Sequence, residues 1–330
     1  HRDLHSFPTR RSSDLRAGIY DREPLQVYSA AVQGFAVNLS DSEVAALGNN
    51  ANVRGIWPDQ MFTLAKPGTD PSAPPAQETP YGIKRVGGVA AYVGGAKAWI
   101  IDTGIDLDHP DLNVNGSIGR NFIATTKTPE DDNGHGTHCA GIVAAKNNTI
   151  GVVGVAPGAT VVPVKVLDRR GSGAYSVIIA GVNYVAGTAT PGDAVNMSLG
   201  GSVYQPIDEA VVAMANKGLF VALAAGNESD DADNHSPARA NDNTIWTISA
   251  CDASDKFAYF SNYGNPPVDF CAPGVGIKST YKNGGYATIS GTSMAAPHAC
   301  GVLLVTIGNP KTSGYVLNDP DGHADPIIHN

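Results

Sequence analysis

The sequence contains little cysteine and lacks the cysteine patterns of disulfide-rich or redox proteins. Four cysteines occur among 330 residues, and no two of them are spaced as a C-x-x-C pair. Four scattered cysteines are too few for a disulfide framework, although three different pairings are conceivable. We therefore expect mostly free, buried thiols at Cys139, Cys251, Cys271 and Cys300.

Long apolar runs and basic clusters are missing as well. No apolar stretch approaches the roughly 20 residues that a membrane-spanning helix needs. The formal net charge is −9, and without a basic cluster this argues against nucleic acid as a partner. The G-x-S-x-G motif of α/β-hydrolase esterases is absent. No G-x-G-x-x-G follows the first strand of a βαβ unit, which argues against a dinucleotide-binding protein.

The first residues show no pattern of a folded element. Residues 1–15 have neither helical nor strand periodicity. The run from His5 to Leu15 resembles the conceptual translation of a common sequencing adapter, so we expect a disordered cloning or assembly artefact there. On this interpretation the natural start of the protein, with any signal peptide, is missing.

A small α+β unit is predicted over residues 16–65. Alternating apolar residues over 27–39 favour strands. Ser40 and Glu43 form a capping-box pattern that predicts the start of a short helix. Val53–Trp57 then predicts a returning strand.

A linker at residues 66–76 leads into a larger domain at residues 77–310. Lys66–Pro80 contains five prolines, which predict an extended, exposed stretch. Strands are then predicted at Ala96–Ile101, Thr160–Leu167, Val195–Ser198, Leu219–Ala225 and Thr244–Ala250. Helices are predicted between them at Thr137–Ala145, Ser176–Gly187 and Ile207–Lys217. This alternation indicates a parallel sheet with helices on both faces, where ligands bind beyond the carboxyl ends of the strands.

The last residues are rich in glycine and aspartate. We expect residues 311–330 to form a tail that lies on the surface. Its D-P-D-G stretch, Asp319–Gly322, resembles part of an EF-hand loop. The alternating acids and the distal glutamate of such a loop are missing, so we expect no calcium there.

The motif GTSMAAPH, Gly291–His298, precedes an apolar run with helical spacing. This pattern places Ser293 at the N-terminus of a buried helix, where unpaired N–H groups and the helix dipole favour developing negative charge. Pro297 is acceptable because it lies close to the first turn. Ser293 is a candidate nucleophile, and for a serine before a helix the alternative is a simple cap.

Asp102 and His135 are residues that could activate such a serine. Asp102 ends the apolar strand AKAWII, and His135 lies between two glycines in NGHGTHCAG, where its imidazole suits a general base. A metal site formed by His135 and His138 is a competing hypothesis, but no third ligand is convincingly placed. Cys139 is interpreted as a small buried hydrophobe.

Asn227 follows the strand LFVALAAG. A carboxamide at this position can donate a hydrogen bond to an oxyanion, with the backbone N–H of Ser293 as the second donor.

Taken in order, the motifs DTGID, HGTHCAG, SLGG, AAGN and GTSMAAPH resemble those of the subtilisin-like serine proteases, the subtilases of peptidase family S8. The order Asp, His, Ser is typical of this family. The resemblance covers about Gln77 to Val305, and the N-terminal unit is similar to the inhibitor I9-like pro-domain of these proteases. It implies an α/β fold with three layers, a mainly parallel central sheet flanked by helices, and a small α+β pro-domain.

The resemblance also implies roles for individual residues. Ser293 would attack the peptide carbonyl, His135 would transfer the proton and Asp102 would orient the imidazole. Asn227 would complete the oxyanion hole. An extended substrate would bind between two backbone segments. The implied substrate-binding residues are Gly171, Ser172, Gly173, Ser198, Leu199, Gly200, Ala225 and Gly226.

A structural calcium site is implied by position, and no catalytic cofactor is expected. Its side-chain ligands would be Gln77, Asp111 and Asn148, and its carbonyl ligands would be Lys146, Ile150 and Val152. Oxygen ligands with one carboxylate suit a hard cation. One departure from the family concerns Glu228–Pro237, which is shorter and more acidic than expected for a specificity-pocket wall and brings His235 near it.

The resulting hypothesis is a secreted serine endopeptidase made as a zymogen. Its partners would be polypeptide substrates and its own pro-domain in cis, without nucleic acid or membrane, and the protein would be a monomer. The alternative is an inactive subtilase homologue that acts as a peptide-binding or structural module. Labelling by a serine-directed phosphonate distinguishes the two.

Overall fold

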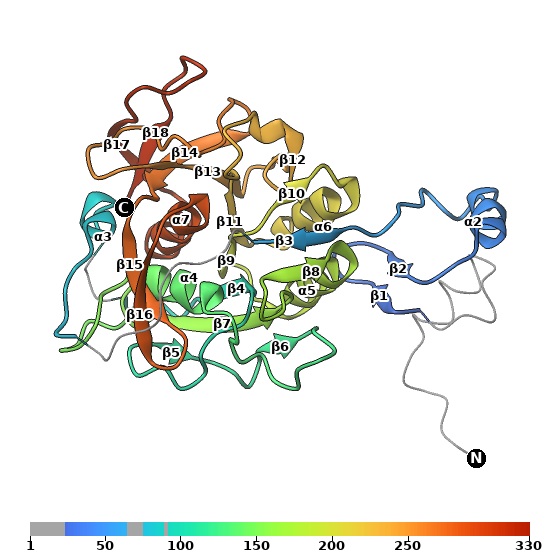
Figure 1. The fold of residues 1–330 in the computed structure, drawn as a ribbon, viewed down its shortest axis with the longest axis horizontal. Helices are drawn as coiled ribbons and strands as arrows, with labels where there is room; N and C mark the ends of the chain where they lie inside the picture. The colour runs from blue at the N-terminus through green and yellow to red at the C-terminus, as the bar shows by residue number, and fades with distance from the viewer. Residues whose placement is uncertain (1–23, 65–74, 89–91) are drawn as a thin grey trace.

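A ten-stranded sheet forms the centre of the computed structural model, which describes residues 24–64, 75–88 and 92–330 (Figure 1). Its order is β17-β18-β14-β13-β11-β9-β4-β7-β5, with β6 also paired to β7. In that order the strands are Lys311–Tyr315, Pro326–His329, Val268–Pro273, Ile245–Cys251, Phe220–Ala224, Ala194–Met197, Ala98–Asp102, Thr160–Lys165 and Asn113–Val114, and β6 is Arg120–Asn121. All pairs are parallel except β17 with β18. The prediction of a mainly parallel sheet is confirmed.

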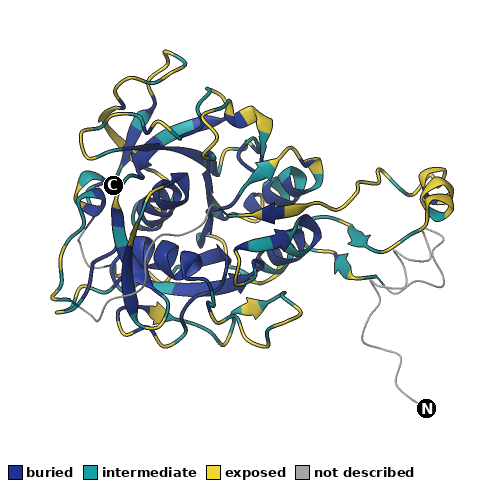
Figure 2. Cartoon of the chain, viewed as in Figure 1, coloured by how far each residue is buried: buried dark blue, intermediate teal, exposed yellow. Residues whose placement is uncertain are grey.

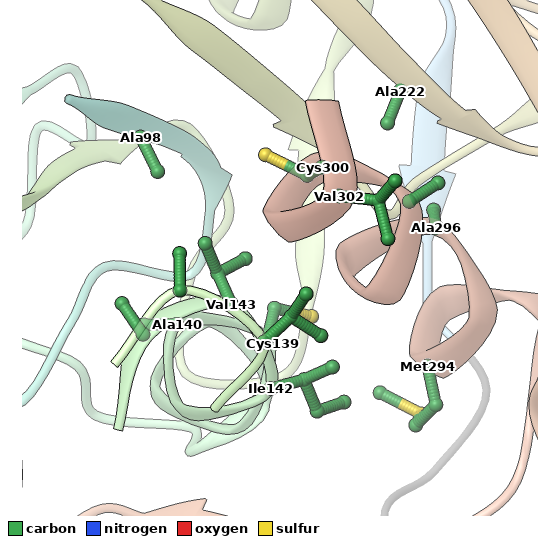
Figure 3. Close-up of a cluster of buried hydrophobic side chains, with 14 of the residues drawn as sticks. Ala98, Cys139, Ala140, Ile142, Val143, Ala222, Met294, Ala296, Cys300 and Val302 are labelled. Carbon is green, nitrogen blue, oxygen red and sulfur yellow. The ribbon is translucent and has the colours of Figure 1, made fainter. Parts of the chain in front are cut away.

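Helices cover both faces of this sheet, and strand β4 shows the consequence. Its five residues are all buried. Ala98 and Ile100 face a core formed with α4 (His135–Ala144) and α7 (Thr292–Thr306), part of which Figure 3 shows. Trp99 and Ile101 face the opposite core, formed with α5 (Tyr175–Thr188) and α6 (Gln205–Ala215). A strand buried on both faces is expected to be continuously apolar, as AWII is.

The N-terminal unit consists of a two-stranded ribbon and one helix. Strands β1 (Gln26–Tyr28) and β2 (Gly34–Ala36) pair antiparallel. The predicted capping box at Ser40 is present at the start of α2 (Asp41–Gly48), which lies far from the central sheet and is mostly exposed (Figures 1 and 2). The ribbon contacts α5 through Tyr28, whose hydroxyl donates to the carbonyl of Ser176 at 3.0 Å.

The predicted strand at Val53–Trp57 is wrong. No strand forms there; instead β3 (Met61–Thr63) forms a few residues later. Its partner is not in the N-terminal unit but is β8 (Ser172–Ala174) of the large domain. The exposed edge of β8 supplies the backbone hydrogen-bonding groups that a strand needs, and this pairing partner cannot be read from the local sequence.

The expectation of a surface tail after residue 310 is also wrong. Strand β18 joins the central sheet through parallel pairing with β14, and Ile327 and Ile328 are fully buried. The segment is recruited because this apolar pair covers the sheet next to β14.

The expectations for the cysteines and for membrane-spanning helices can be compared with the structure, whereas those for residues 1–15 and the domain boundaries cannot. All four cysteines are free and buried, as predicted. None of the helices within the described residues is long and apolar enough to cross a bilayer. The predicted artefact at residues 1–15 and most of the linker lie outside the described residues, and the proposed domain boundaries stay predictions.

The remaining elements lie around the sheet. They are the helix α3 (Tyr81–Arg85), the 3-10 helix Ala232–Asn234, the pair β10 (Gly201–Ser202) with β12 (His235–Ser236), and the hairpin β15 (Ile277–Tyr281) with β16 (Gly285–Ile289).

Candidate active site

Asp102 and His135 meet beyond the carboxyl end of β4. Asp102 is the last residue of that strand, and His135 is the first residue of α4. Nδ1 of His135 lies 2.8 and 2.9 Å from the two carboxylate oxygens of Asp102. The approach depends on glycine, because a Cβ at Gly136 would collide with the carbonyl of Gly104. With Nδ1 directed at the carboxylate, Nε2 is left to exchange a proton with a reacting group.

Burial and the neighbouring carboxylate act in opposite directions on His135. Burial lowers the pKa of the imidazole, whereas the negative charge of Asp102 raises it, and the net pKa lies well above its ordinary value. Cys139 lies close by, with its sulfur 3.9 Å from Nδ1 of His135. Burial raises the pKa of the Cys139 thiol, so it stays protonated and fits the interpretation as a small apolar residue.

Ser293 is the second residue of α7 and is 9% exposed. Its hydroxyl donates to the carbonyl of Ser198 at 3.1 Å. Among the described residues no hydrogen bond joins Ser293 Oγ to His135 Nε2. A rotation of the serine side chain is therefore needed before proton transfer, which is common in structures without substrate.

Pro297 lies deeper in α7 than the sequence indicates. It is an interior residue of the helix, so its missing N–H deprives the carbonyl of Ser293 of the usual helical donor. Two side chains donate to this carbonyl instead: Ser198 Oγ at 2.8 Å and Cys139 Sγ at 3.4 Å. These two residues therefore hold the backbone of Ser293 in place.

Asn227 is oriented by the residue that precedes Ser293. Its Oδ1 accepts hydrogen bonds from the backbone N–H of Thr292 at 2.8 Å and from the Thr292 hydroxyl at 3.1 Å. Within the described residues Nδ2 of Asn227 donates to no other group. The N–H of Ser293 lies in the first turn of α7, where helical partners are lacking. Both groups are thus available as donors.

The predicted substrate-binding segments lie in different surroundings. Gly171, Ser172 and Gly173 border the N-terminal unit: the N–H of Leu64 donates to the carbonyl of Gly171 at 2.9 Å, and Phe62 is paired with Gly173. Ser198, Leu199 and Gly200 follow β9, and in the described residues none of their backbone groups bonds to β3. Ala225 and Gly226 directly precede Asn227 at the end of β11.

The residues predicted as calcium ligands also converge. Asp111 is fully buried and accepts from Asn148 Nδ2 at 2.7 Å and from the N–H of Val152 at 3.1 Å. Gln77 Nε2 donates to the carbonyls of Lys146 at 3.0 Å and Val152 at 3.5 Å. The N–H of Ile150 donates to Asn148 Oδ1 at 2.8 Å.

The competing metal pair is not supported. His138 is fully buried, and its Nε2 lies 3.1 Å from the carbonyls of both Ile277 and Ala287, so this nitrogen is already engaged. Among the described residues, one group of three potential ligands lies close enough together to hold a metal ion, namely Asp102, His135 and Cys139, and His138 is not part of it.

Two residues near the site were missed by the sequence analysis. Thr292 orients Asn227, and its place inside the GTSMA motif could have indicated such a role. Asn262 contacts the turn that carries Asn227. No local pattern in SNYG, Ser261–Gly264, indicates a role for Asn262, because the contact depends on tertiary structure.

Comparison with known proteins identifies the class to which this fold and site belong. Residues 95–318 match the model of the subtilase family, peptidase S8, and residues 1–65 match that of the peptidase inhibitor I9 family. The second match includes residues 1–15, for which the artefact stays a prediction.

Individual relatives agree. An alkaline serine protease, ver112, of Corniculantispora psalliotae is 36% identical over 298 residues, which are 86% of this chain and 74% of the relative. Subtilisin-like protease 6 of Trichophyton rubrum is 36% identical over 337 residues, which are 96% and 79% of the two chains. The crystal structure of a cold-adapted subtilisin-like serine proteinase matches with a TM-score of 0.67 at 33% identity, covering 76% of this chain and 97% of that one.

The chain belongs to the subtilase family. It is a serine endopeptidase made as a zymogen with an I9-type pro-segment.

Proposed function

We propose that Ser293, His135 and Asp102 form the catalytic triad of this endopeptidase. Ser293 Oγ attacks the carbonyl carbon of the scissile peptide bond while His135 Nε2 takes the hydroxyl proton, and the imidazolium then gives this proton to the leaving amine. Asp102 keeps Nδ1 protonated and stabilises the imidazolium. The observation that carries the proposal is the 2.8 Å contact of His135 Nδ1 with Asp102.

The negative charge that develops on the substrate oxygen needs donors. We assign this role to Nδ2 of Asn227 and the N–H of Ser293. The hydrogen bonds from Thr292 to Asn227 Oδ1 support this assignment, because they occupy the acceptor oxygen of the amide and leave its NH₂ group free to donate. Asn227→Ala is expected to lower kcat far more than it raises KM, since the charge exists only after attack.

We further propose that Gly171–Gly173 and Ser198–Gly200 bind the substrate backbone, with Ala225 and Gly226 beside the scissile bond. Support comes from the antiparallel pairing of Met61–Thr63 with β8. A polypeptide substrate would add a strand to the same edge. The pro-segment acts in cis at the site that a substrate would use.

The triad is tested by replacing its nucleophile. Ser293→Ala is expected to lose labelling by a serine-directed phosphonate and nearly all turnover of a chromogenic peptide, while the fold stays intact. Ser290→Ala is the matched control, because Ser290 is an exposed serine on the same segment. Residual turnover within tenfold of wild type in Ser293→Ala would refute the triad and favour the inactive-homologue alternative.

We also propose that the cluster around Asp111 holds a structural calcium ion. Burial raises the pKa of Asp111, and no lysine or arginine of the described chain pairs with this carboxylate. The carbonyls of Lys146 and Val152 face the amide of Gln77, and a turn of that amide would add its oxygen to the set. Gln77, Asp111, Lys146, Asn148, Ile150 and Val152 would hold the ion. It would neutralise a buried charge and tie the loops together.

Secretion and a monomeric state complete the proposal. Both are consistent with a chain of net charge −9 that acts on polypeptides. Size-exclusion chromatography of the matured enzyme and assay of the culture medium of a producing strain test them.

A further inference from the structure

We propose that Asn262 is a positioning residue that sets the geometry of the oxyanion site by clamping the turn that carries Asn227. The inference rests on the proposed role of Asn227. Asn262 lies on the loop between β13 and β14 and is fully buried. It does not touch the reacting atoms, so any effect on catalysis must pass through the turn.

The side chain of Asn262 makes all four of its strong hydrogen bonds with residues 225–230. Its Nδ2 donates to the carbonyl of Ala225 at 3.0 Å and to the carboxylate of Glu228 at 2.8 Å. Its Oδ1 accepts from the N–H of Glu228 at 2.9 Å and from the N–H of Asp230 at 3.1 Å. A carboxamide offers two donor hydrogens and two acceptor lone pairs, so its whole capacity is used on one turn.

This pattern requires an amide in one orientation. Two acceptors face Nδ2, and two N–H donors face Oδ1. A carboxylate at position 262 would keep the two accepted bonds but face the carbonyl of Ala225 and the carboxylate of Glu228 without a proton to offer. An apolar residue would remove all four hydrogen bonds and leave the carbonyl of the buried Ala225 without this donor, which is costly.

The backbone of Asn262 adds a further link at Gly226. The N–H of Asn262 donates to the carbonyl of Gly226 at 3.0 Å. Gly226 has φ of +110°, and a Cβ at this position would collide with Nδ2 of Asn262. The glycine before Asn227 is therefore needed both for its backbone conformation and for the close approach of the clamp.

Two chains of hydrogen bonds connect Asn262 to Asn227. The carboxylate oxygen of Glu228 that receives Nδ2 of Asn262 also accepts the backbone N–H of Asn227, at 2.8 Å. The N–H of Gly226 donates to the hydroxyl of Thr292 at 3.1 Å, and Thr292 in turn holds Oδ1 of Asn227. Displacing Asn262 would therefore move both the backbone and the side-chain amide of Asn227.

The loop that carries Asn262 is itself fixed to the central sheet. Ala258 N–H donates to the carbonyl of Ala250 at 2.8 Å, and Ala250 N–H donates to the hydroxyl of Ser261 at 3.0 Å. Ala250 belongs to β13, the sheet neighbour of β11. Asn262 thus connects a rigid strand to the exposed Asn227, and small errors in the place of an oxyanion donor are costly in rate.

The test is a mutant cycle on the full chain, matured and counted by active-site titration. Wild type, Asn227→Ala, Asn262→Asp and the double variant are compared by kcat and KM on a chromogenic peptide. We expect Asn262→Asp to lower kcat about tenfold or more, but by no more than the hundred- to thousandfold loss that removal of an oxyanion donor itself causes, with KM within about twofold. In the Asn227→Ala background the same substitution should change kcat by less than about twofold, because the two residues act as a unit.

Two further variants test the donor and acceptor pattern around Asn262. Glu228→Gln added to Asn262→Asp removes the repulsion between two carboxylates but leaves the carbonyl of Ala225 without its donor, so we expect it to regain only part of the lost kcat. Asn262→Ser removes the amide without adding charge and is measured in parallel. The matched control is Asn121→Ser, because Asn121 clamps a loop near β6 by bonds to Ile123 and Thr126; we expect its kcat to be unchanged.

The outcomes separate the two hypotheses. If Asn227→Ala leaves kcat unchanged, the oxyanion assignment fails and the positioning role falls with it. A second outcome is that Asn227→Ala lowers kcat, but Asn262→Asp lowers kcat by the same factor in the wild-type and Asn227→Ala backgrounds, or changes KM alone. This would refute the positioning role of Asn262 and leave the oxyanion assignment of Asn227 standing. If neither Asn262 variant yields titratable sites while Asn121→Ser does, Asn262 is a folding residue and the proposal is wrong.

Discussion

Ser198 donates its hydroxyl hydrogen to the carbonyl oxygen of Ser293 at 2.8 Å. In a regular helix the backbone N–H four residues later would donate to this carbonyl, but that residue is Pro297, which has no N–H. The backbone of Ser293 is therefore held by a side chain from the residue that follows β9, which links this segment directly to the start of α7.

Removing this donor should destabilise the protein, and restoring the helical donor should compensate. In a Ser293→Ala background, which prevents self-digestion, Ser198→Ala is expected to lower the free energy of unfolding by about 1–3 kcal/mol, because a buried carbonyl keeps only a thiol donor. Adding Pro297→Ala returns an N–H and should recover part of this loss. Urea denaturation measures both; a double variant no more stable than Ser198→Ala alone would contradict the account.

The pro-segment should stabilise helix α5 by capping it. The N-cap residue Ala174 has no capping side chain, and Asp59 accepts instead from the N–H and hydroxyl of Ser176, at 3.0 and 2.5 Å. Asp59→Ala in the inactive precursor is expected to cost about 1 kcal/mol. Asp59→Asn keeps acceptor capacity but loses the charge that the helix dipole favours, so it should cost less. Equal stability of Asp59→Ala and wild type in thermal unfolding would rule the cap out.

His298 should make the protein sensitive to acid. Burial lowers the pKa of His298 from 6.5 to about 4. Below pH 6.5 the unfolded chain takes up a proton that the folded chain refuses until about pH 4, so stability falls as the pH decreases through this window, by about 1.4 kcal/mol per pH unit. Burial likewise lowers the pKa of His138, to about 3.

The measurement must isolate His298 from groups that titrate in the opposite sense. Burial raises the pKa of three carboxyl groups to about 6, those of Asp208, Asp269 and Asp325, and their protonation favours the folded state as the pH falls. The difference in unfolding free energy between wild type and His298→Gln cancels these contributions. It should shrink from pH 7.5 to pH 5; a difference that is constant over this range would show that His298 is not responsible.

Calcium should raise the melting temperature through Asp111. Binding to the folded state alone stabilises it by mass action, by about 2.7 kcal/mol when free calcium exceeds its dissociation constant a hundredfold. Chelation should remove this gain in the wild type, and Asp111→Asn should abolish the response. Asp319→Asn serves as control, because the loop of Asp319 is predicted to bind no calcium. A response that survives in Asp111→Asn would place the ion elsewhere.

Much of the framework could be predicted because it depends on local patterns. The continuous apolar run before Asp102 indicates a strand buried on both faces, and Ser40 with Glu43 indicates a helix start; both elements are present. The five motifs were enough to indicate the family. They could not show that Ser293 Oγ points to Ser198 rather than His135, because a side-chain rotamer depends on packing around it.

Long-range pairing explains why the predicted strand at Val53–Trp57 and the predicted surface tail after residue 310 were wrong. The strand at Met61–Thr63 pairs with β8, and Ile327 pairs with Cys271 of β14. Partners so far apart in the chain leave no periodic signal in either segment, and the same holds for the contacts of Asn262. Such pairings follow from which sheet edges are free in the folded domain, which a local pattern does not encode.

The antiparallel contact of Met61–Thr63 with β8 has a consequence for how activity would respond to dilution. While the two segments belong to one chain, their effective concentration is set by the connecting chain and does not change with the amount of protein present. A cut between them turns the pro-segment into an ordinary competitor whose occupancy falls as the solution is diluted. A cleaved sample that is inactive when concentrated should therefore gain specific activity on dilution, whereas an uncut sample should not.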